Sequence, residues 1–201
     1  MNKQQAKATL AKMYGPNYLF GDTETTGLSK TSELVEIAIT DHEGNVLMDT
    51  LIKPKGEIPK VVSDIHGIFA EDVKDSPSWA DVHEQFLEVL GDKTLVFYNR
   101  SFDLRLIKQT AGLYGLGGIE FEEKIEDQTV CAMKPYAVFN GELTKTGAAR
   151  SVKLVVAAEQ EGVVMTDFSG GAHRALFDSV MVQRMVKNLA SGNSKEEALP
   201  L

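Results

Sequence analysis

The sequence contains little cysteine, no long apolar run and a shortage of positive charge. Its single cysteine, Cys131, excludes an intrachain disulfide and fits a reducing compartment. No stretch approaches the ~20 apolar residues of a membrane span, and residues 1–15 lack the apolar region of a secretory signal. We therefore expect a soluble, cytoplasmic protein with no membrane partner.

The shortage of positive charge narrows the classes of nucleic-acid protein. Lysine and arginine number 21 against 29 aspartates and glutamates, which gives a net charge of −8. A protein that coats nucleic acid is usually basic, because neutralising phosphates supplies most of the non-specific affinity. The acidic balance argues against such a protein, but it does not exclude an enzyme that grips one strand end through metal ions.

The apolar pattern predicts strands first and then strands alternating with helices, which is typical of one α/β sheet with a leading antiparallel hairpin. We expect strands at 18–20, 34–40, 45–54 and 94–98, and a short one near Asp127. We expect helices at 3–14, 78–90, 151–161 and 173–190, and one after the strand at 94–98 that has Phe102, Leu106 and Ile107 on one face. We expect loops at 54–59 and 141–150. The chain is long enough for one domain, over 18–190, between an N-terminal extension at 1–17 and a mobile tail at 191–201.

Two acids, Asp22 and Glu24, stand one residue apart at the end of the first apolar run. Residues i and i+2 of a strand share a face, so both side chains should project together. Carboxylates ~4 Å apart repel by several kcal/mol at an intermediate effective dielectric constant, and the segment DTETTG holds no lysine or arginine. A divalent cation such as Mg²⁺ or Mn²⁺ suits these hard oxygen ligands. The alternative, more common for an isolated D-x-E, is a pair of solvated turn residues.

Further acids strengthen the metal hypothesis. Asp103 begins a helix after a buried strand, where ligands collect in open α/β sheets, although alone it would be an acid that complements the helix dipole. His173 precedes Asp178 by five residues, and a straight helix would separate the two by ~140°. The two residues can serve one site if His173 lies at the edge of the SGGA segment (169–172) and Asp178 lies one turn inside the helix. Standing alone, His173 would be a surface histidine.

The segments DTETTGL, NRSFD and HRALFD, in this order, resemble the three motifs of the DEDD 3′–5′ exonucleases. The histidine five residues before the last aspartate marks the DEDDh branch, and the resemblance covers 18–190. It implies a ribonuclease H-like mixed sheet and removal of nucleoside 5′-monophosphates from the 3′ end of single-stranded DNA or RNA. Position by position, it implies that two Mg²⁺ or Mn²⁺ ions are held by Asp22, Glu24, Asp103 and Asp178, with Asp22 on both, and that His173 is the general base.

Two positions depart from the family pattern. Gly21 replaces a larger apolar residue before the first aspartate, and Tyr98 stands where many members have histidine. Neither is one of the five chemical positions, which are the four acids and the histidine, so we expect the protein to be an active nuclease.

The expected substrate contacts are Thr25, His66, Asn99, Lys145, Arg150 and Lys153. His66 lies in IHGI (65–68), which we expect to be a loop near the terminal nucleotide; the alternative role is a hydrogen bond that structures the loop. Residues 133–153 hold four basic side chains and one acid. This stretch is either a track for the phosphates of the incoming strand or a solvated face.

A second hypothesis is a proofreading or binding subunit that docks on a polymerase or another nucleic-acid assembly. The short C-terminal tail favours a stand-alone enzyme, as a monomer or homodimer. A non-catalytic relative is disfavoured because all five chemical positions are filled. The choice between DNA and RNA is open, because no motif here identifies a contact to a 2′-hydroxyl.

Overall fold

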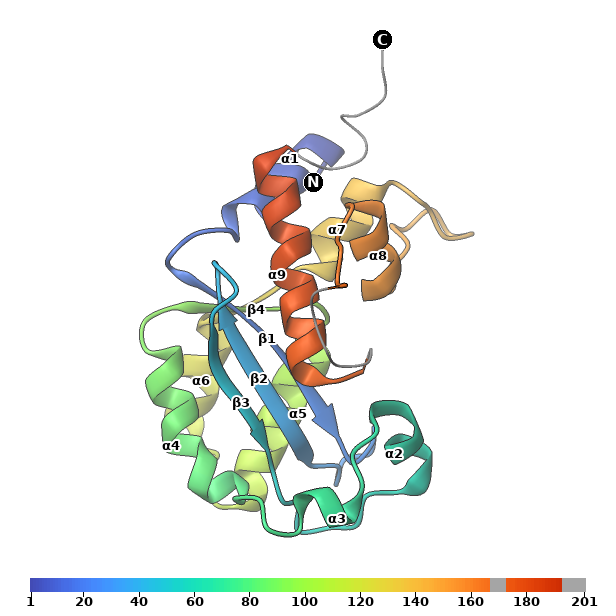
Figure 1. Cartoon of the computed structure of the whole chain (residues 1–201). Coiled ribbons are helices and arrows are strands. Elements are labelled where there is room, and N and C mark those ends of the chain that lie inside the picture. The colour runs from blue at the N-terminus through green and yellow to red at the C-terminus, as the bar shows by residue number, and fades with distance from the viewer. Residues whose placement is uncertain (167–172, 193–201) are drawn as a thin grey trace.

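The computed structural model describes residues 1–166 and 173–192 (Figure 1). Over these residues the core is a mixed five-stranded sheet in the order β3-β2-β1-β4-β5. The strands are β1 (Tyr18–Thr25), β2 (Leu34–Asp41), β3 (Val46–Leu51), β4 (Thr94–Phe97) and β5 (Thr129–Cys131). β2 pairs antiparallel with β1 and β3, whereas β4 pairs parallel with β1 and β5. The predicted mixed sheet with a leading antiparallel hairpin is confirmed.

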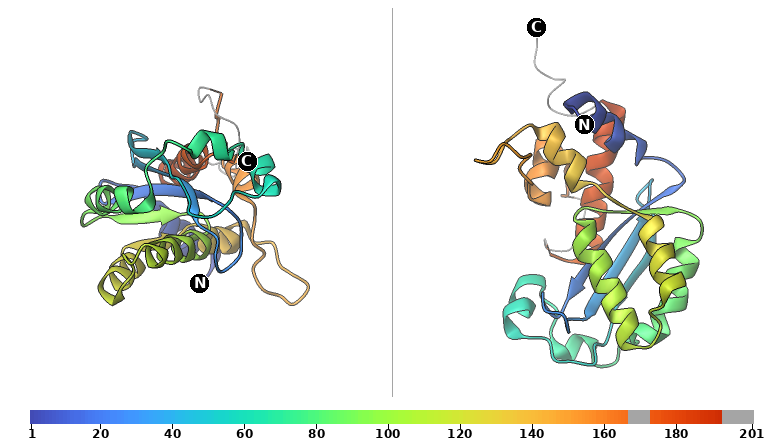
Figure 2. Two further views of the ribbon diagram at one scale, coloured as in Figure 1. Left: turned by 90° about the horizontal axis from the view of Figure 1, so that it is seen from below. Right: turned by 180° about the vertical axis from the view of Figure 1, so that it is seen from behind.

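Helices cover both faces of the sheet (Figures 1 and 2). Alternate residues of β1 enter different cores: Leu19 packs with α4 (Trp79–Leu90) and α5 (Arg100–Leu113), and Phe20 packs with α1 (Lys3–Lys12) and α9 (Ala175–Ser191). Both side chains are fully buried. Because β1 is central and buried on both faces, a charged side chain on it needs a partner.

The helix predicted at 3–14 is α1. Asn2 begins it, because the Asn2 side chain accepts the Gln5 N–H at 2.9 Å and the Gln5 side chain accepts the Asn2 N–H. Ala6 and Leu10 are fully buried, against α9 and α7 (Met133–Asn140). The extension is therefore packed into the core on the α9 face.

Three short helices were not predicted: α2 (Lys60–His66), α3 (Ala70–Val73) and α6 (Ile119–Asp127). The expectation that IHGI is a loop is wrong for Ile65 and His66, the last two residues of α2, which ends before Gly67 takes a left-handed conformation with φ 71°. Val61 and Ile65 of α2 remain exposed, so this helix lacks the buried stripe that makes a helical pattern recognisable.

The first strand, expected at 18–20, continues through the acids to Thr25, and the remaining boundaries differ by a few residues from the expected ones. The short strand near Asp127 is β5, which follows α6, and the helix expected at 151–161 is α8 (Leu154–Gln160). The segment 169–172 and most of the tail, 193–201, lie outside the described residues. No described helix is long and apolar enough to cross a membrane.

The structure explains why a glycine stands at position 21 in place of a larger apolar residue. A Cβ atom there would lie 3.0 Å from Leu95 Cδ1 and 3.2 Å from the Ala38 carbonyl oxygen. Leu95 and Phe97 of β4 occupy the space that a larger side chain would need. The glycine therefore lets β1 and β4 pack closely, directly before Asp22.

Candidate active site

Three carboxylates from the two ends of the sequence meet on one face of the sheet. Asp22 and Glu24 lie two residues apart on β1 and point to the same side, the side that α9 covers (Figure 1). Asp178 lies in the first turn of α9. Carboxylate oxygens of the three residues lie within 4.8 Å of one another.

Asp103 reaches the same place because β4 is short. β1 continues to Thr25, whereas its pairing with β4 ends at Gly21. α5 begins just beyond β4, and its first turn carries Asp103. The Thr23 hydroxyl donates a hydrogen bond to Asp103 Oδ1 at 2.8 Å. Asp103 thus lies beside the second half of β1, and after burial its charge is the next cause of the raised pKa of Asp22.

Burial raises the pKa of every acid in the cluster, and repulsion from other acids of the cluster adds to this at Asp22, Glu24 and Asp103. Burial, and then the charges of Asp103 and Asp178, raise the pKa of Asp22 well above its usual range. Burial, followed by repulsion from neighbouring acids, raises the pKa of Glu24 to about 9. Burial also raises the pKa of Asp103 to about 7 and that of Asp178 to about 6. The four carboxylates can all be ionised at neutral pH only with a compensating positive charge.

The donor set fits a hard divalent cation. Asp178 Oδ1 is buried without a hydrogen-bond partner, which is uncommon for a buried polar atom. Asp22, Glu24 and Asp178 form the group of acids close enough to hold a metal ion among the described residues. Oxygen-only donors suit Mg²⁺ or Mn²⁺. The residues expected to hold metal are therefore brought together, with Asp103 beside them.

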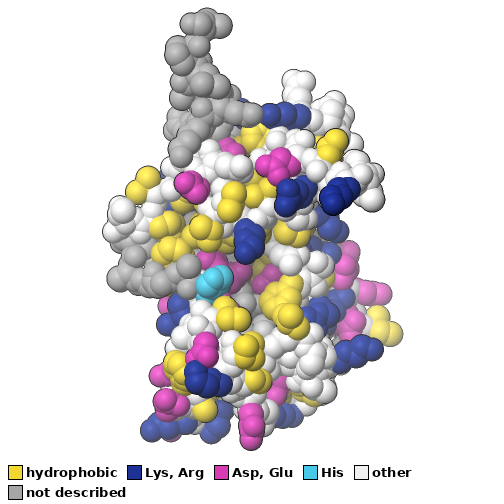
Figure 3. All heavy atoms as spheres, turned by 90° about the vertical axis from the view of Figure 1, so that its right-hand side faces the viewer, with side chains coloured by type: hydrophobic (Ala, Val, Ile, Leu, Met, Phe, Trp, Pro, Cys, Tyr) yellow, Lys and Arg dark blue, Asp and Glu magenta, His cyan; other side chains and the backbone are white. Residues whose placement is uncertain are grey.

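His173 lies just outside α9. The helix begins at Ala175, so His173 does not share its periodicity, and Asp178 lies one turn inside, as expected. The His173 side chain is exposed, and its charge opposes the rise that burial causes in the pKa of Asp178. Figure 3 shows histidine atoms beside acidic side chains in a hollow of the surface, with apolar side chains on both sides.

Two cavities flank the acids. The Glu24 cavity, of about 580 Å³, is lined by Glu24, Thr25, Thr26, Gly27, Leu28, Ser29, Ser32, Pro59, Val61, Val62, Ile65, His66 and Phe102. The Asp178 cavity, of about 640 Å³, is lined by Tyr98, Asn99, Met133, Ser151, Val152, Lys153, Leu154, Val155, Val156, His173 and Asp178. The acid cluster thus separates a cavity without lysine or arginine from one with a lysine.

Thr25 and His66, two of the expected substrate contacts, line the Glu24 cavity. The Thr25 hydroxyl donates to the Gly27 carbonyl at 3.0 Å. His66 Nδ1 accepts the Ile68 N–H at 3.0 Å, and its Nε2 lies 3.2 Å from the Thr25 carbonyl oxygen. Burial lowers the pKa of His66. These contacts match the alternative role for His66, a hydrogen bond that structures its surroundings.

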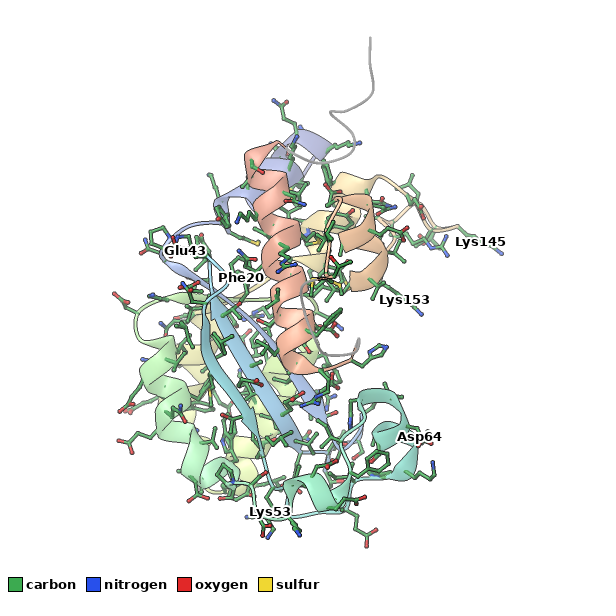
Figure 4. The ribbon with its side chains drawn as sticks, viewed as in Figure 1. Phe20, Glu43, Lys53, Asp64, Lys145 and Lys153 are labelled. Atoms are coloured by element: carbon green, nitrogen blue, oxygen red, sulfur yellow. The ribbon has the colours of Figure 1, made fainter. Side chains whose placement is uncertain are left out.

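The other expected contacts lie on the opposite side of the acids. Asn99 and Lys153 line the Asp178 cavity. Lys145 and Arg150 lie outside both cavity linings, on an exposed hairpin of residues 142–150 that a bridge between Leu143 and Ala149 closes. Figure 4 shows Lys153 at the start of α8 and Lys145 on the projecting hairpin, on the same side of the molecule.

The surroundings of the motif residues were not predicted from the sequence. Leu28, Val61 and Ile65 are exposed apolar side chains at the Glu24 cavity. Glu36 of β2 binds Arg174 next to His173. The signal for Glu36 was present, since it is an acid in the middle of the apolar run LVEIAIT, and a buried acid requires a partner.

Comparison with known proteins agrees with this geometry. A model of the Exonuclease family matches residues 19–184. An uncharacterized exonuclease, CP81 of Escherichia phage 186, is 40% identical over 176 residues, which cover 88% of this chain and 89% of the phage protein. The DNA polymerase III subunit epsilon of Rickettsia prowazekii is 32% identical over 108 residues, covering 51% of this chain and 47% of that subunit. The chain thus spans about half the length of this second relative.

Solved structures confirm the predicted ribonuclease H-like fold. Exonuclease X in complex with 5′ overhanging duplex DNA superposes with a TM-score of 0.63 at 23% identity, covering 88% of this chain and 93% of that one. A 3′-exonuclease that recognises the 3′ end of a histone mRNA stem-loop gives a TM-score of 0.68 at 14% identity, covering 96% and 81%. At these identities the likeness concerns the fold.

Proposed function

The chain belongs to the exonuclease family, and we propose that it removes nucleotides one at a time from the 3′ end of single-stranded DNA or RNA, with two Mg²⁺ or Mn²⁺ ions. The products are nucleoside 5′-monophosphates, and the activity is placed in the cytoplasm. The observation that carries this proposal is the convergence of four acids with raised pKa values at the end of β1. DNA and RNA are both included because the acids act at the phosphate, which the two share.

The positions of the acids support separate assignments. Asp22 belongs to the group of three acids with Glu24 and Asp178, and the charge of Asp103 raises its pKa more than the charge of either of those two does. Asp22 is therefore assigned to both ions, Glu24 and Asp178 to one, and Asp103 to the second. Bound divalent cations lower the pKa of the attacking water and offset the charge that builds on the phosphate and on the leaving 3′-oxygen.

His173 is assigned as the general base that accepts the proton of the attacking water. Its side chain is exposed beside Asp178 and lines the Asp178 cavity, so it is accessible to water without being part of the group of three acids. A general base contributes roughly 10²–10⁴-fold to rate. His173 thus handles the proton while the acids hold the ions.

The two cavities suggest a path for the strand. The apolar walls of the Glu24 cavity fit one base and sugar, and the lack of lysine and arginine there does not suit a run of phosphates. Lys153 in the Asp178 cavity and Lys145 on the hairpin are available to phosphates upstream of the cleaved bond. Arg150 of the hairpin pairs with Glu142 at 3.7 Å, and a phosphate can replace Glu142 in this exposed ion pair. The terminal nucleotide is therefore assigned to the Glu24 cavity, with Thr25 and His66 in its wall and Asn99 on the upstream side.

A panel of DNA and RNA oligomers tests the proposal. With Mg²⁺ or Mn²⁺, a 5′-labelled strand gives a descending ladder and a 3′-labelled strand releases labelled mononucleotide first. EDTA stops both reactions, and duplex ends are slower because unpairing costs a few kcal/mol. Rapid cutting of a closed circular single strand, or activity that resists EDTA, contradicts the proposal.

The second candidate is a proofreading subunit docked on a polymerase. The observation in its favour is the 32% identity to a DNA polymerase III subunit epsilon. Affinity purification of the tagged chain from its host distinguishes the two: co-purification of a polymerase whose proofreading needs Asp22 supports the subunit, whereas full activity of the chain alone on free 3′ ends supports the stand-alone enzyme.

A further inference from the structure

Glu36 is a buried acid in the middle of β2. Its side chain is only 2% exposed, and it lies directly across the strand pair from Glu24. Like charges directly opposite one another destabilise a sheet, and a buried carboxylate needs a charged or hydrogen-bonding partner. The residue that satisfies Glu36 must therefore approach from the face that carries the acid cluster.

That partner is the segment that leads into α9. The Arg174 guanidinium binds the Glu36 carboxylate, with Nε at 3.0 Å from Oε1. The backbone N–H of Ala175 donates to Glu36 Oε2 at 2.8 Å. The side chain of the N-cap residue, Arg174, makes no capping hydrogen bond at the start of α9, and Glu36 supplies an acceptor from a distant strand. One carboxylate thus holds two consecutive residues.

The residue before this clamp is His173. Its φ of 67° makes it the one non-glycine residue with positive φ in the described part of the chain. This left-handed conformation is unfavourable for a residue with a Cβ atom, so surrounding contacts must maintain it. The contacts of Glu36 with Arg174 and Ala175 fix the chain immediately after His173.

Asp178 has an anchor of its own. The neighbouring Ser179 hydroxyl donates to the Phe20 carbonyl at 2.8 Å and lies 3.2 Å from the Thr40 hydroxyl. This contact ties the first turns of α9 to β1 and β2 without help from Glu36. Loss of the clamp should therefore disturb His173 more than Asp178.

We infer that Glu36 and Arg174 are positioning residues that hold His173 over the reacting phosphate. The inference rests on the proposed role of His173 as general base. The clamp acts through the backbone: it sets the direction in which the chain enters α9, and thereby the place of the histidine side chain. Arg174 need not touch the substrate.

A double-mutant cycle in the full chain tests the clamp. The variants are Arg174→Ala, His173→Ala and the double variant, assayed on a 5′-labelled oligonucleotide with Mn²⁺, together with thermal melts with and without Mn²⁺. Arg174→Lys keeps the charge but not the planar two-point contact. If Arg174→Ala does not fold, Arg174→Lys replaces it in the double-mutant cycle. Lys108→Ala is the matched control, because it removes a cation paired at 2.7 Å with Glu126, away from both cavity linings.

Arg174→Ala is expected to lower kcat by about 10–100-fold, the range typical of groups that orient a functional side chain. KM and the Mn²⁺-induced thermal shift stay at their wild-type values, Arg174→Lys retains part of the rate, and Lys108→Ala is unchanged. In the His173→Ala background, removal of Arg174 has no further effect, because the residue that it positions is gone.

Three results overturn the clamp: equal losses from Arg174→Ala in both backgrounds, a rise in KM in place of a fall in kcat, or loss of the thermal shift. The proposed role of His173 fails on a different result. If His173→Ala alone cleaves at the wild-type rate, His173 is not the general base, whatever the effect of Arg174→Ala.

Discussion

The Glu24 cavity and the Asp178 cavity each contain one acid of the cluster, and the rest of their linings differ. The Glu24 cavity has exposed Leu28 and Val61 and no lysine or arginine. The Asp178 cavity has His173 and Lys153. Apolar walls suit a base, whereas a general base and a cation suit water and phosphate. The difference gives the site a direction: the terminal nucleotide on one side, and the proton acceptor and upstream strand on the other.

The largest expected effect comes from Asp22, which belongs to the acid cluster and lines neither cavity. Asp22→Asn should lower activity by at least roughly 10³-fold, because metal ions supply several kcal/mol of transition-state stabilisation. In the wild type, Mn²⁺ at ~100 times its dissociation constant should add ~2.7 kcal/mol to the free energy of unfolding. Asp22→Asn should lose most of this gain, and its metal-free form should be more stable than the metal-free wild type because repulsion is relieved. Thermal melts and rates measure both, and an undiminished thermal shift would contradict the assignment of Asp22.

The next largest effect on activity is expected from a substitution in the Glu24 cavity, which Leu28 lines. Leu28 is 78% exposed, and a bound base would bury part of it. Leu28→Ala should lower kcat/KM by roughly tenfold, since burying an apolar side chain is worth ~1.5–3 kcal/mol in full. The loss should disappear on a substrate whose terminal nucleotide lacks a base. Val46→Ala, which truncates a half-exposed side chain outside both linings, is the control. An equal loss on the abasic end would show that Leu28 does not contact the base.

A smaller effect is expected in the Asp178 cavity. Lys153→Gln should weaken binding a few-fold at low salt and reduce the slope of log K against log salt by ~0.7, the value for one phosphate contact on a single strand. Lys74→Gln, an exposed lysine near Asp75, should leave the slope unchanged. Equal slopes for wild type and Lys153→Gln would remove Lys153 from the strand path. Titrations at several salt concentrations give the answer.

A last effect concerns the stability of the protein without metal. The folded pKa values of Glu24 and Asp178 are raised, so in this pH range the folded state binds more protons than the unfolded state. The free energy of unfolding therefore falls as pH rises. For Glu24 the window runs from 4.5 to about 9, and for Asp178 from 3.8 to about 6. Glu24→Gln should flatten the profile up to a higher pH than Asp178→Asn does. Urea melts in EDTA across these windows measure the slopes, and identical profiles for the two variants would contradict the difference in burial.

Much of the fold followed from local patterns. The strand at 34–41 and the helix at 79–90 were expected within one residue, and the start of the strand at 18–25 was expected as well, because β-branched runs and helical spacing indicate which side chains are buried. α2 was missed because Val61 and Ile65 face the Glu24 cavity and not a core. Apolar residues at a site do not follow the periodicity of a core.

The sequence by itself determined that Asp22 and Glu24 share a face, because side chains alternate along a strand. It also determined that Asp103 and Asp178 lie near the starts of helices. Only the tertiary structure decided that β4 ends early enough for Asp103 to lie beside β1, and that Glu36 holds Arg174 next to His173. The physical reason is that the face to which a side chain of a strand points is set locally by the backbone. Burial, raised pKa values and the partner of a buried charge depend on segments that meet only in the folded chain.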